Sequence, residues 1–368
     1  MVQERPALTE IVPDRVPGKP VQIGSLRLAS RFLLAPLAGF TNLPFRLVVR
    51  RLGGLGLATT DLISARALII GGGKSLDLAE TCPEDNPVSL QLFGSEPDIM
   101  ARAAQWAEAN GAHVVDINMG CPVHKVVKGG GGSAMMCQPG STVDLVSKVV
   151  EAVKIPVTVK MRLGWDDEQI TAPEFAREFE KRGVAAITIH GRTREQAFKG
   201  SVNIDGIRRV VEAVEKIPVF GNGDVRGLAD AAAMFHKTGC AGIAIGRGAL
   251  MHPWFFRRLA SWDATGDPGP QPTYRERLQF MCDHFECLLK LRPERFACVT
   301  FRKVSTWYCK VLRPGKEIQH ELVMIQSAEH FRKVAERIGE IIDKREGAGD
   351  WHPAEHDIRL PSGPIAHW

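Results

Sequence analysis

The sequence predicts an α/β protein made of a (β/α)8 TIM barrel followed by a small all-helical C-terminal domain. Two observations lead to this prediction. Up to residue 260, eight short apolar segments alternate with amphipathic helical patterns, and beyond residue 273 the strand pattern disappears. Apolar strands covered by helices are typical of parallel sheets, and eight of them over roughly 230 residues match the count and size of such a barrel. A doubly wound open sheet is the alternative, but the strand count favours the barrel.

The expected strands are rich in Val, Ile and Leu, and each ends in a cluster of Gly, Asn, His or Asp. They are Phe32–Leu37, Leu57–Thr60, Val88–Phe93, Val114–Asn118, Val157–Met161, Ala186–His190, Pro218–Gly221 and Gly242–Ile245. Between them, apolar residues recur with the helical period. The expected helices include Asp98–Asn110, Val143–Val153, Pro173–Arg182, Ile204–Val214 and Leu228–His236.

The chain is expected to divide into five segments. They are an N-terminal extension (1–25), the barrel (26–262), a linker (263–273), a helical domain (274–345) and a Pro-rich tail (346–368). The linker is assigned because Pro and Gly dominate it and only one alanine is apolar. Within the helical domain, Arg292-Pro293 and Arg313-Pro314-Gly315 predict breaks between helices.

The composition excludes several classes of protein. With 44% hydrophobic and 24% charged residues, the chain is too apolar to be disordered. No apolar run approaches the roughly 18 to 20 residues that span a bilayer. The first twenty residues mix acidic and basic side chains with four prolines, which is not the pattern of a signal peptide. We therefore expect a cytoplasmic protein.

The cysteines are expected to be reduced thiols rather than a disulfide scaffold or a metal site. Eight cysteines are few for 368 residues, and no export signal is expected. No Cys-x-x-Cys motif occurs, and the single local pair, Cys121 and His124, has no further ligand nearby. No metal is expected.

The excess positive charge lies in one segment. Residues 274–345 contain 15 Lys and Arg against 10 Asp and Glu, which equals the whole net charge of +5. A basic module beside a neutral one favours a polyanionic partner. A helical bundle with ordinary surface lysines is the alternative.

Polar residues follow nearly every expected strand. In a barrel of this kind the active site lies at the carboxyl ends of the strands. The residues at those ends are Gln91, Asp116, Asn118, Cys121, Lys160, Arg162, His190, Arg192, Asn222, Asp224 and Arg247. Any one of them could be an ordinary polar group at the barrel mouth, but their number predicts a functional site.

Two glycine-rich loops predict a phosphate site. Gly221–Asp224 and Gly246–Gly248 follow the last two strands, where such barrels bind phosphate through backbone N–H groups. Turn formation alone would explain either loop, whereas the pair favours a phosphorylated cofactor or substrate. Lys160 implies an anionic partner, such as a reduced flavin ring. His190 could contact the same ligand, although a lone histidine is more often structural.

The segment after the fourth strand presents a thiol. Gly120 and Pro122 flank Cys121 in a tight turn, and a thiol so placed can be a nucleophile, a redox group or a general acid. Lys125 and Lys128 precede four consecutive glycines at 129–132. This pattern predicts a mobile lid that is preceded by two lysines and is suited to close over a bulky anionic substrate.

Together these motifs resemble the tRNA-dihydrouridine synthases. They are Leu34-Ala-Pro-Leu-Ala-Gly-Phe-Thr-Asn42, Asp116-Ile-Asn-Met-Gly-Cys-Pro122, Lys125-Val-Val-Lys128, Val159-Lys-Met-Arg162, Ile189-His-Gly-Arg-Thr193, Gly221-Asn-Gly-Asp224 and Gly246-Arg-Gly-Ala249. The sequence is most similar to the bacterial B-type branch at His190-Gly-Arg-Thr-Arg-Glu-Gln196 and at Phe301-Arg-Lys303 with Trp307-Tyr308. Asn203-Ile-Asp205 departs from that branch, which usually has an Ala-Asp-Trp-like stretch there.

The resemblance implies a tightly bound FMN across the barrel mouth and NADPH as the reductant. The residues it implies for cofactor binding are Pro36, Leu37, Ala38, Gln91, Lys160, His190, Asn222, Gly223, Asp224, Gly246 and Arg247. It further implies that a uridine in the D-loop of tRNA is reduced to 5,6-dihydrouridine. Reduced flavin would give hydride to C6, and Cys121 would give the proton to C5.

The same resemblance implies a set of residues that face the tRNA. They are Asn118, Lys125, Lys128, Arg162 and Arg192 near the mouth, and Arg302, Lys303, Lys310, Arg313 and Lys316 in the helical domain. Trp307 and Tyr308 can equally belong to the helical core. A monomer is expected.

Three other functions stay open at this point. One is an FMN barrel oxidoreductase that acts on a small pyrimidine-like molecule and has no need of the basic helical domain. Another is a tRNA-binding folding factor with a vestigial redox site. The third is a barrel without flavin, such as an aldolase or isomerase, which would be colourless.

Overall fold

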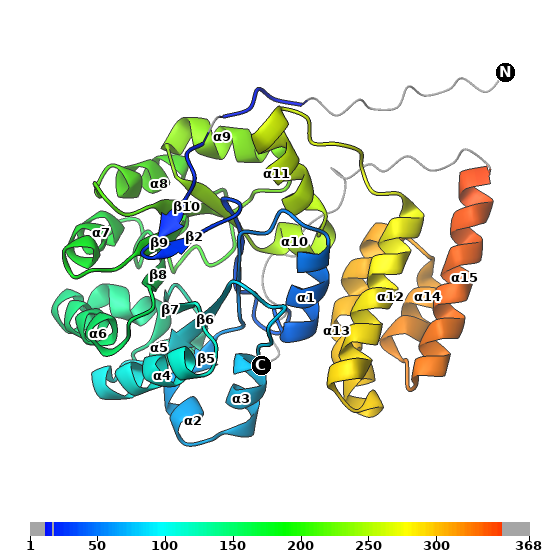
Figure 1. Ribbon diagram of the computed structural model, residues 1–368, viewed down its shortest axis with the longest axis horizontal. Coiled ribbons are helices and arrows are strands. Elements are labelled where there is room, and N and C mark those ends of the chain that lie inside the picture. Colours follow the sequence, from blue (N-terminus) through cyan, green and yellow to red (C-terminus); the bar gives the residue numbers. More distant parts are fainter. Residues whose placement is uncertain (1–11, 17, 348–368) are drawn as a thin grey trace.

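The computed structural model describes residues 12–16 and 18–347, and its largest part is a closed parallel barrel (Figure 1). The strands pair in the order β4, β3, β11, β10, β9, β8, β7, β6, and a pairing of β4 with β6 closes the ring. These eight strands are Phe32–Leu34 (β3), Leu57–Thr59 (β4), Val88–Phe93 (β6), Val114–Met119 (β7), Val157–Arg162 (β8), Ala186–His190 (β9), Val219–Asn222 (β10) and Gly242–Ile245 (β11). The predicted (β/α)8 barrel is confirmed.

A short ninth strand, Ile63–Ser64 (β5), continues along β6 beyond the point where β4 ends. Between β4 and β5 the chain leaves the sheet at Asp61, so this carboxylate lies at the mouth of the barrel. The strands are buried on both faces because helices cover them outside and side chains fill the inside. Their sequences are therefore almost continuously apolar.

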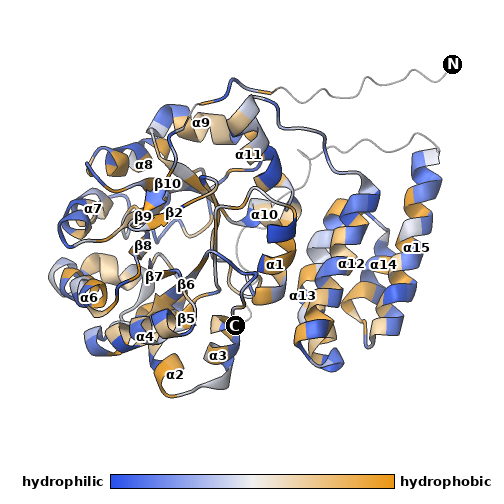
Figure 2. Ribbon diagram, viewed as in Figure 1, coloured by the Kyte–Doolittle hydropathy of each residue, from blue (hydrophilic) through white to orange (hydrophobic). Residues whose placement is uncertain are grey.

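The helices around the barrel are amphipathic, and their polar faces point outward (Figure 2). They are Leu43–Arg51 (α1), Ala65–Ile69 (α2), Gly73–Ala79 (α3), Pro97–Ala109 (α4), His124–Lys128 (α5), Pro139–Ala152 (α6), Ala172–Lys181 (α7), Ile204–Val211 (α8), Leu228–Thr238 (α9), Arg247–Met251 (α10) and Phe255–Thr265 (α11), together with a 3-10 turn at Gly132–Cys137 (η1). Helix α6 begins four residues before the expected start, because Pro139 occupies its first turn, where proline is well tolerated.

A small hairpin fills the amino-terminal end of the barrel. Strands Gln22–Ile23 (β1) and Leu26–Arg27 (β2) pair antiparallel around Gly24, whose φ is +55°. Ile23 is buried and packs inside the barrel with Leu33 and Phe220. The structure thus corrects the expected limit of the N-terminal extension, because residues 21–25 belong to the barrel. Two-residue strands carry too little periodicity to be recognised in sequence.

Four helices form the C-terminal domain, which lies beside the barrel next to α1 and α10 (Figure 1). They are Tyr274–Leu291 (α12), Glu294–Leu312 (α13), Lys316–Val323 (α14) and Ala328–Gly347 (α15). The two predicted breaks are confirmed. Trp307 and Tyr308 are buried, so they belong to the core of this domain. Helix α11 runs to Thr265, three residues into the expected linker, and the expected tail beyond residue 347 lies outside the described residues.

A shared apolar core and one half-buried ion pair join the two parts. The apolar cluster around the barrel continues into the helical domain without a break. Within the barrel, Arg46 of α1 and Asp85 form a fully buried ion pair, which Arg50 also joins at 2.9 Å. Beside it, Arg292 after α12 pairs with Glu80 after α3. The helical domain is therefore held firmly against the barrel. No helix within the described ranges is long and apolar enough to cross a membrane.

Candidate active site at the barrel mouth

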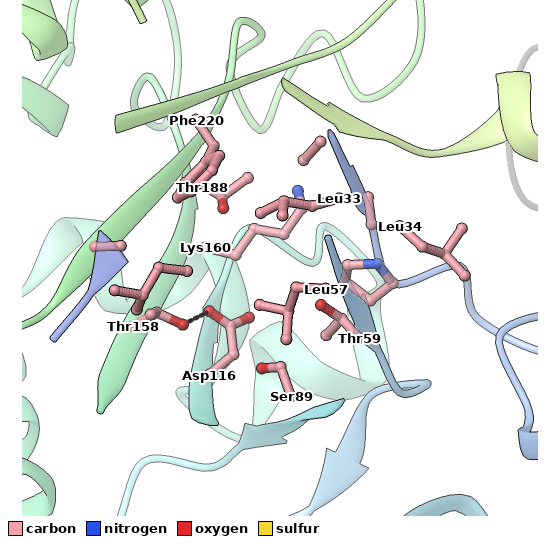
Figure 3. Close-up of a pocket in the computed structure, with 15 residues that line it drawn as sticks. Leu33, Leu34, Leu57, Thr59, Ser89, Asp116, Thr158, Lys160, Thr188 and Phe220 are labelled. Atoms are coloured by element: carbon pink, nitrogen blue, oxygen red, sulfur yellow. Dashed lines mark hydrogen bonds between the residues drawn. The ribbon is translucent and has the colours of Figure 1, made fainter. Parts of the chain in front are cut away.

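The strand register places four of the predicted polar residues in two pairs on neighbouring strands. Gln91 on β6 lies beside Asp116 on β7, and Asn118 on β7 lies beside Lys160 on β8. A pocket in the barrel interior is lined by apolar side chains and by polar ones, among them Ser89, Asp116, Thr158 and Lys160 (Figure 3). In Figure 3 the Lys160 side chain extends across this space, and a dashed line joins Thr158 to Asp116.

Four side chains form a continuous buried hydrogen-bond chain. Thr158 Oγ1 and Gln91 Nε2 each donate to the Asp116 carboxylate over 2.6 Å. Asn118 Nδ2 then donates to Gln91 Oε1 over 2.7 Å. Burial raises the pKa of Asp116, whereas the two donors and the charge of Lys160 lower it. Three neighbours, Gln91, Thr158 and Lys160, thus stabilise negative charge on the Asp116 carboxylate.

Cys121 follows this chain at the mouth. Asn118 Oδ1 accepts from the backbone N–H of Cys121 over 2.9 Å and from that of Gly120 over 3.2 Å. The thiol is half-buried, and burial together with the charge of Asp61 raises its pKa, although nearby cations oppose the shift. The thiol is therefore protonated at neutral pH and can serve as an acid.

The glycine run packs under Cys121. Gly131 and Gly132 are buried, and a Cβ on Gly132 would come within 2.7 Å of the Cys121 carbonyl oxygen. Ser133 donates to that same oxygen through both its N–H and its hydroxyl. Gly132 therefore permits a close contact beneath Cys121, and the mobile lid stays a prediction. Lys125 and Lys128 stand exposed on α5 next to this segment.

Lys160 is the central cation of the mouth. Its Nζ donates to Asn222 Oδ1 over 3.0 Å, and Asn222 Nδ2 donates to the Ala244 carbonyl over 2.7 Å. Burial, reinforced by the charge of Arg162, lowers the pKa of Lys160 to about 8. An anionic ligand would restore the ordinary pKa, so this lysine is suited to bind one.

His190 is neutral in this setting. Burial lowers its pKa well below the ordinary value, and the surrounding cations, Arg162 and Lys160 first among them, act in the same direction. Arg192 Nη1 lies 3.4 Å from His190 Nε2. Because a guanidinium group only donates, this ring nitrogen accepts and the proton is assigned to Nδ1. The imidazole therefore offers one N–H donor to the mouth.

Two arginines predicted to face the substrate hold loops together. Arg162 donates from Nε to the Gly120 carbonyl and from Nη1 to the carbonyls of Thr193 and Ala197. The guanidinium nitrogens of Arg192 are occupied by the Lys199 and Gly200 carbonyls, by Asp224 Oδ2 and by His190. Both side chains are about 2% exposed. Arg192 is therefore bound largely to the protein itself, and its contact with a substrate stays a prediction.

The two phosphate loops meet around Asp224. Its carboxylate lies 2.6 Å from Arg192 Nη2 and 3.5 Å from Arg247 Nη2, and its φ is +52°. Gly223 has a φ of +120°, and a Cβ there would come within 2.6 Å of Val202. Burial lowers the pKa of Arg247, and the negative charge of Asp224 acts against this shift. The two loops are thus held together by ion pairs centred on Asp224.

Sequence reasoning missed Asp61 and Phe198. Asp61 is buried, accepts from the N–H groups of Gly39 and Leu62, and has its pKa raised by burial to about 6. It directly follows an expected strand, so the rule used for the other mouth residues would have found it. Phe198 lies 5.4 Å from the guanidinium carbons of both Arg162 and Arg247. Its position depends on a loop that no local pattern predicts.

The loop after β3 touches the helical domain. Pro36, Leu37 and Ala38 are half-buried, and Leu37 N–H donates to Thr41 Oγ1 over 3.1 Å. Phe40 meets Trp307 of α13 edge to face at 6.1 Å. The Lys310 ammonium lies 4.8 Å from the centre of the Trp307 ring. The helical domain therefore reaches the rim of the mouth.

The basic residues of the helical domain fall into two groups. Arg302 is half-buried and donates to the Ile325 carbonyl, so it links α13 to the segment after α14. Lys303, Lys310, Arg313 and Lys316 are exposed. Of the residues predicted to face tRNA, Arg302 thus makes a contact within the protein, whereas the other four have side chains exposed to solvent.

An eight-stranded barrel with buried cations and a half-buried thiol at its carboxyl end defines a TIM-barrel protein whose mouth suits an anionic ligand. The family model for dihydrouridine synthase (Dus) matches residues 33–343. The chain belongs to this family.

Named relatives match over most of their own length. A protein of Synechocystis sp. named probable tRNA-dihydrouridine synthase 1 is 40% identical over 320 residues, which cover 87% of this chain and 89% of that protein. The tRNA-dihydrouridine synthase B of Xanthomonas axonopodis pv. citri is 37% identical over 290 residues, 79% of this chain and 87% of its own. A solved structure of a 2-naphthoyl-CoA reductase with 2-naphthoyl-CoA has a TM-score of 0.53 at 12% identity, over 68% of this chain and 52% of that chain. This last likeness supports the fold alone.

Proposed function

We propose that the protein reduces a uridine in the D-loop of tRNA to 5,6-dihydrouridine, with FMN as cofactor and NADPH as reductant. The observation that carries the proposal is a protonated, half-buried thiol, Cys121, at a mouth whose central group is the half-buried cation Lys160. Such a mouth combines an acid with a site for an anionic ring. Membership of the family and the names of the relatives support the reaction.

The residues present fit FMN. Lys160 would stabilise negative charge on a reduced flavin ring, and neutral His190 would donate one hydrogen bond. Asn222, Gly223, Asp224, Gly246 and Arg247 would hold the phosphate, because glycine allows a backbone to approach a ligand closely and loops at this position bind phosphate in such barrels. Pro36, Leu37 and Ala38 would line the ring, and Gln91 would contact its polar edge.

The chemistry divides between cofactor and chain. FMN, when bound and reduced by NADPH, supplies the hydride that reaches C6 of the uracil. Cys121 donates its proton to C5, which its raised pKa allows at neutral pH. The backbone bonds to Asn118 and Ser133 hold this thiol in place. The target base must leave its stack to enter the mouth.

Exposed lysines would bind the tRNA backbone. Lys125 and Lys128 flank the mouth on α5, and Lys303 and Lys310 lie on the outer face of α13, which reaches the rim through Trp307. We therefore propose that residues 274–345 form a tRNA-binding domain. A cytoplasmic monomer remains the expectation for the whole protein.

The proposal is tested first by a visible absorption spectrum and then by tRNA chemistry. We expect flavin bands that bleach on anaerobic addition of NADPH, and tRNA lacking dihydrouridine that gains two hydrogen atoms at a D-loop uridine, measured by mass spectrometry. A colourless protein that binds no added FMN would contradict the proposal.

A second arm separates tRNA from small molecules. Free uridine and uracil are offered under the same conditions, and reduction of these at the rate seen with tRNA would favour the small-molecule alternative. This comparison is preferable to deleting residues 274–345, because the deletion would cut the apolar core that the helical domain shares with the barrel.

A further inference from the structure

The buried hydrogen bonds that connect Asp116 with Cys121 all run in the same sense, with each donor on the Cys121 side and each acceptor on the Asp116 side. Asp116 and Asn118 lie two residues apart on β7, so their side chains share the inner face. Gln91 on the neighbouring strand β6 bridges them, with bonds of 2.6 Å to Asp116 and 2.7 Å to Asn118. The chain therefore crosses between strands and returns, and it ends at the backbone of Cys121.

The carboxylate decides which way each amide points. Both oxygens of Asp116 accept, one from Thr158 and one from Gln91, so Gln91 presents its NH2 group to Asp116 and its oxygen to Asn118. Asn118 must then present its NH2 group to Gln91 and its oxygen to the Cys121 turn. That oxygen accepts from two backbone N–H groups, those of Gly120 and Cys121. Reversing one amide would place donor against donor or acceptor against acceptor.

We propose that Asp116 is a positioning residue, which fixes the turn that carries Cys121 by orienting the amides of Gln91 and Asn118. The inference deepens the proposed function and rests on it, because it concerns the thiol proposed there as the proton donor. Asp116 itself reaches neither the thiol nor the mouth surface, since it is about 5% exposed and both of its oxygens are bonded. Its effect on Cys121 therefore passes through the two amides.

The closest competing explanation is that Asp116 serves as the counter-ion of Lys160. The two side chains line the same pocket, and Figure 3 shows them on neighbouring strands. The two explanations differ in what a nearly isosteric Asp116→Asn change should disturb. An amide at position 116 can donate or accept, so it no longer selects one orientation of Gln91. If the carboxylate serves Lys160, the change should instead affect the anion site.

The direct test follows the thiol itself. The rate at which iodoacetamide alkylates Cys121 is measured by mass spectrometry of the peptide that contains it, in the full-length wild type and in D116N. We expect about a tenfold increase in D116N, the scale of losing one positioning hydrogen bond. Ser89→Ala is the matched control, because Ser89 lines the same pocket without a place in the chain, and its rate should stay within about twofold.

The test of the route is a double-mutant cycle. Once Asn118→Ala has removed the last link, D116N should alter the alkylation of Cys121 no further. An equal effect of D116N in the presence and absence of Asn118 would overturn the proposal. Gln91→Met breaks the middle link and leaves Asp116 intact. An unchanged Cys121 rate in Q91M would also overturn the proposal, even if D116N failed to fold.

Turnover measurements add a second readout. D116N should lower kcat for tRNA reduction with little change in KM, while bleaching of the flavin by NADPH keeps its rate. Slowed bleaching together with unchanged alkylation would assign the carboxylate to Lys160 instead and overturn the inference. If wild-type protein forms no dihydrouridine, the proposed function fails, and the alkylation comparison still decides the inference by itself.

Discussion

The barrel mouth and the outer face of α13 both carry positive charge, but they use it differently. At the mouth, Arg162 and Arg192 are buried and bonded to named oxygens. On α13, Lys303 and Lys310 are exposed, and neither forms an ion pair with any residue in the described ranges. Burial makes a charge costly unless its partners are fixed, so buried charge specifies geometry. Exposed charge is screened and adaptable, which suits the binding of a polyanion.

The contact of Phe40 with Trp307 lies where these two regions meet. Phe40 belongs to the loop that Asp61 holds at Gly39, and Trp307 carries Lys310 over its ring. A tRNA held on α13 would therefore lie against the rim of the mouth. The comparison predicts that changes in the mouth alter chemistry, fold stability and pH response, whereas changes on α13 alter affinity and salt response.

The largest effect is expected for Cys121→Ala. Losing the proton donor should reduce the rate of dihydrouridine formation by about 10²- to 10⁴-fold, the usual contribution of a general acid. The affinity for tRNA should stay the same, because the change removes no charge that faces the RNA. Cys137→Ala is the control, since this exposed thiol at the end of η1 has no part in the site. Equal losses in both variants would contradict the assignment of Cys121.

The next largest effect concerns stability and compares buried with exposed ion pairs. Arg46→Ala leaves Asp85 buried without its closest partner and should lower the free energy of unfolding by about 3 to 5 kcal/mol. Arg332→Ala breaks an exposed pair with Glu286 and should cost less than about 1 kcal/mol. Denaturant unfolding measures both. Similar costs would show that burial does not decide how much an ion pair contributes to the stability of this protein.

A smaller effect is expected in the pH dependence of stability. The pKa of Asp61 is about 6 in the folded protein against an ordinary 3.8. The folded state therefore binds the proton more tightly, so this group stabilises the fold most at low pH and loses that contribution as pH rises through the window from 3.8 to 6. The loss is at most about 3 kcal/mol.

Asp61→Asn should remove this part of the pH dependence, measured as the free energy of unfolding at several pH values across that window. Asp283→Asn on the exposed side of α12 is the control and should leave the wild-type dependence intact. A D61N protein that loses stability with pH as steeply as the wild type would show that Asp61 titrates normally.

The smallest effects are expected on α13. Lys303→Ala and Lys310→Ala should each weaken tRNA binding a few-fold and reduce the slope of log affinity against log salt by about 1. The value of kcat at saturating tRNA should not change. Lys333→Ala is the control, because this α15 lysine pairs with Glu329. An unchanged salt slope in both α13 variants would place the RNA elsewhere on the protein.

Much of the fold was predictable because its signals are local. Eight apolar runs predicted eight strands, and two Pro-containing breaks predicted where the helices of the C-terminal domain end. The hairpin β1–β2 was not predictable, because two-residue strands exist only through their packing inside the barrel. The packing of Gly132 was not predictable for a similar reason. Local sequence shows that glycine permits motion, but not that Gly132 lies against Cys121.

By itself, the sequence determined which residues stand at the strand ends, because strand length and alternation are local properties of the chain. It also placed the excess positive charge in the C-terminal segment. Only the tertiary structure decided what those residues do. Arg192 proved to hold loops, Asp61 to support the first mouth loop, and Asp116 to connect through two amides with Cys121. These roles depend on the register between strands far apart in the sequence and on hydrogen bonds that a low-dielectric interior requires to be satisfied.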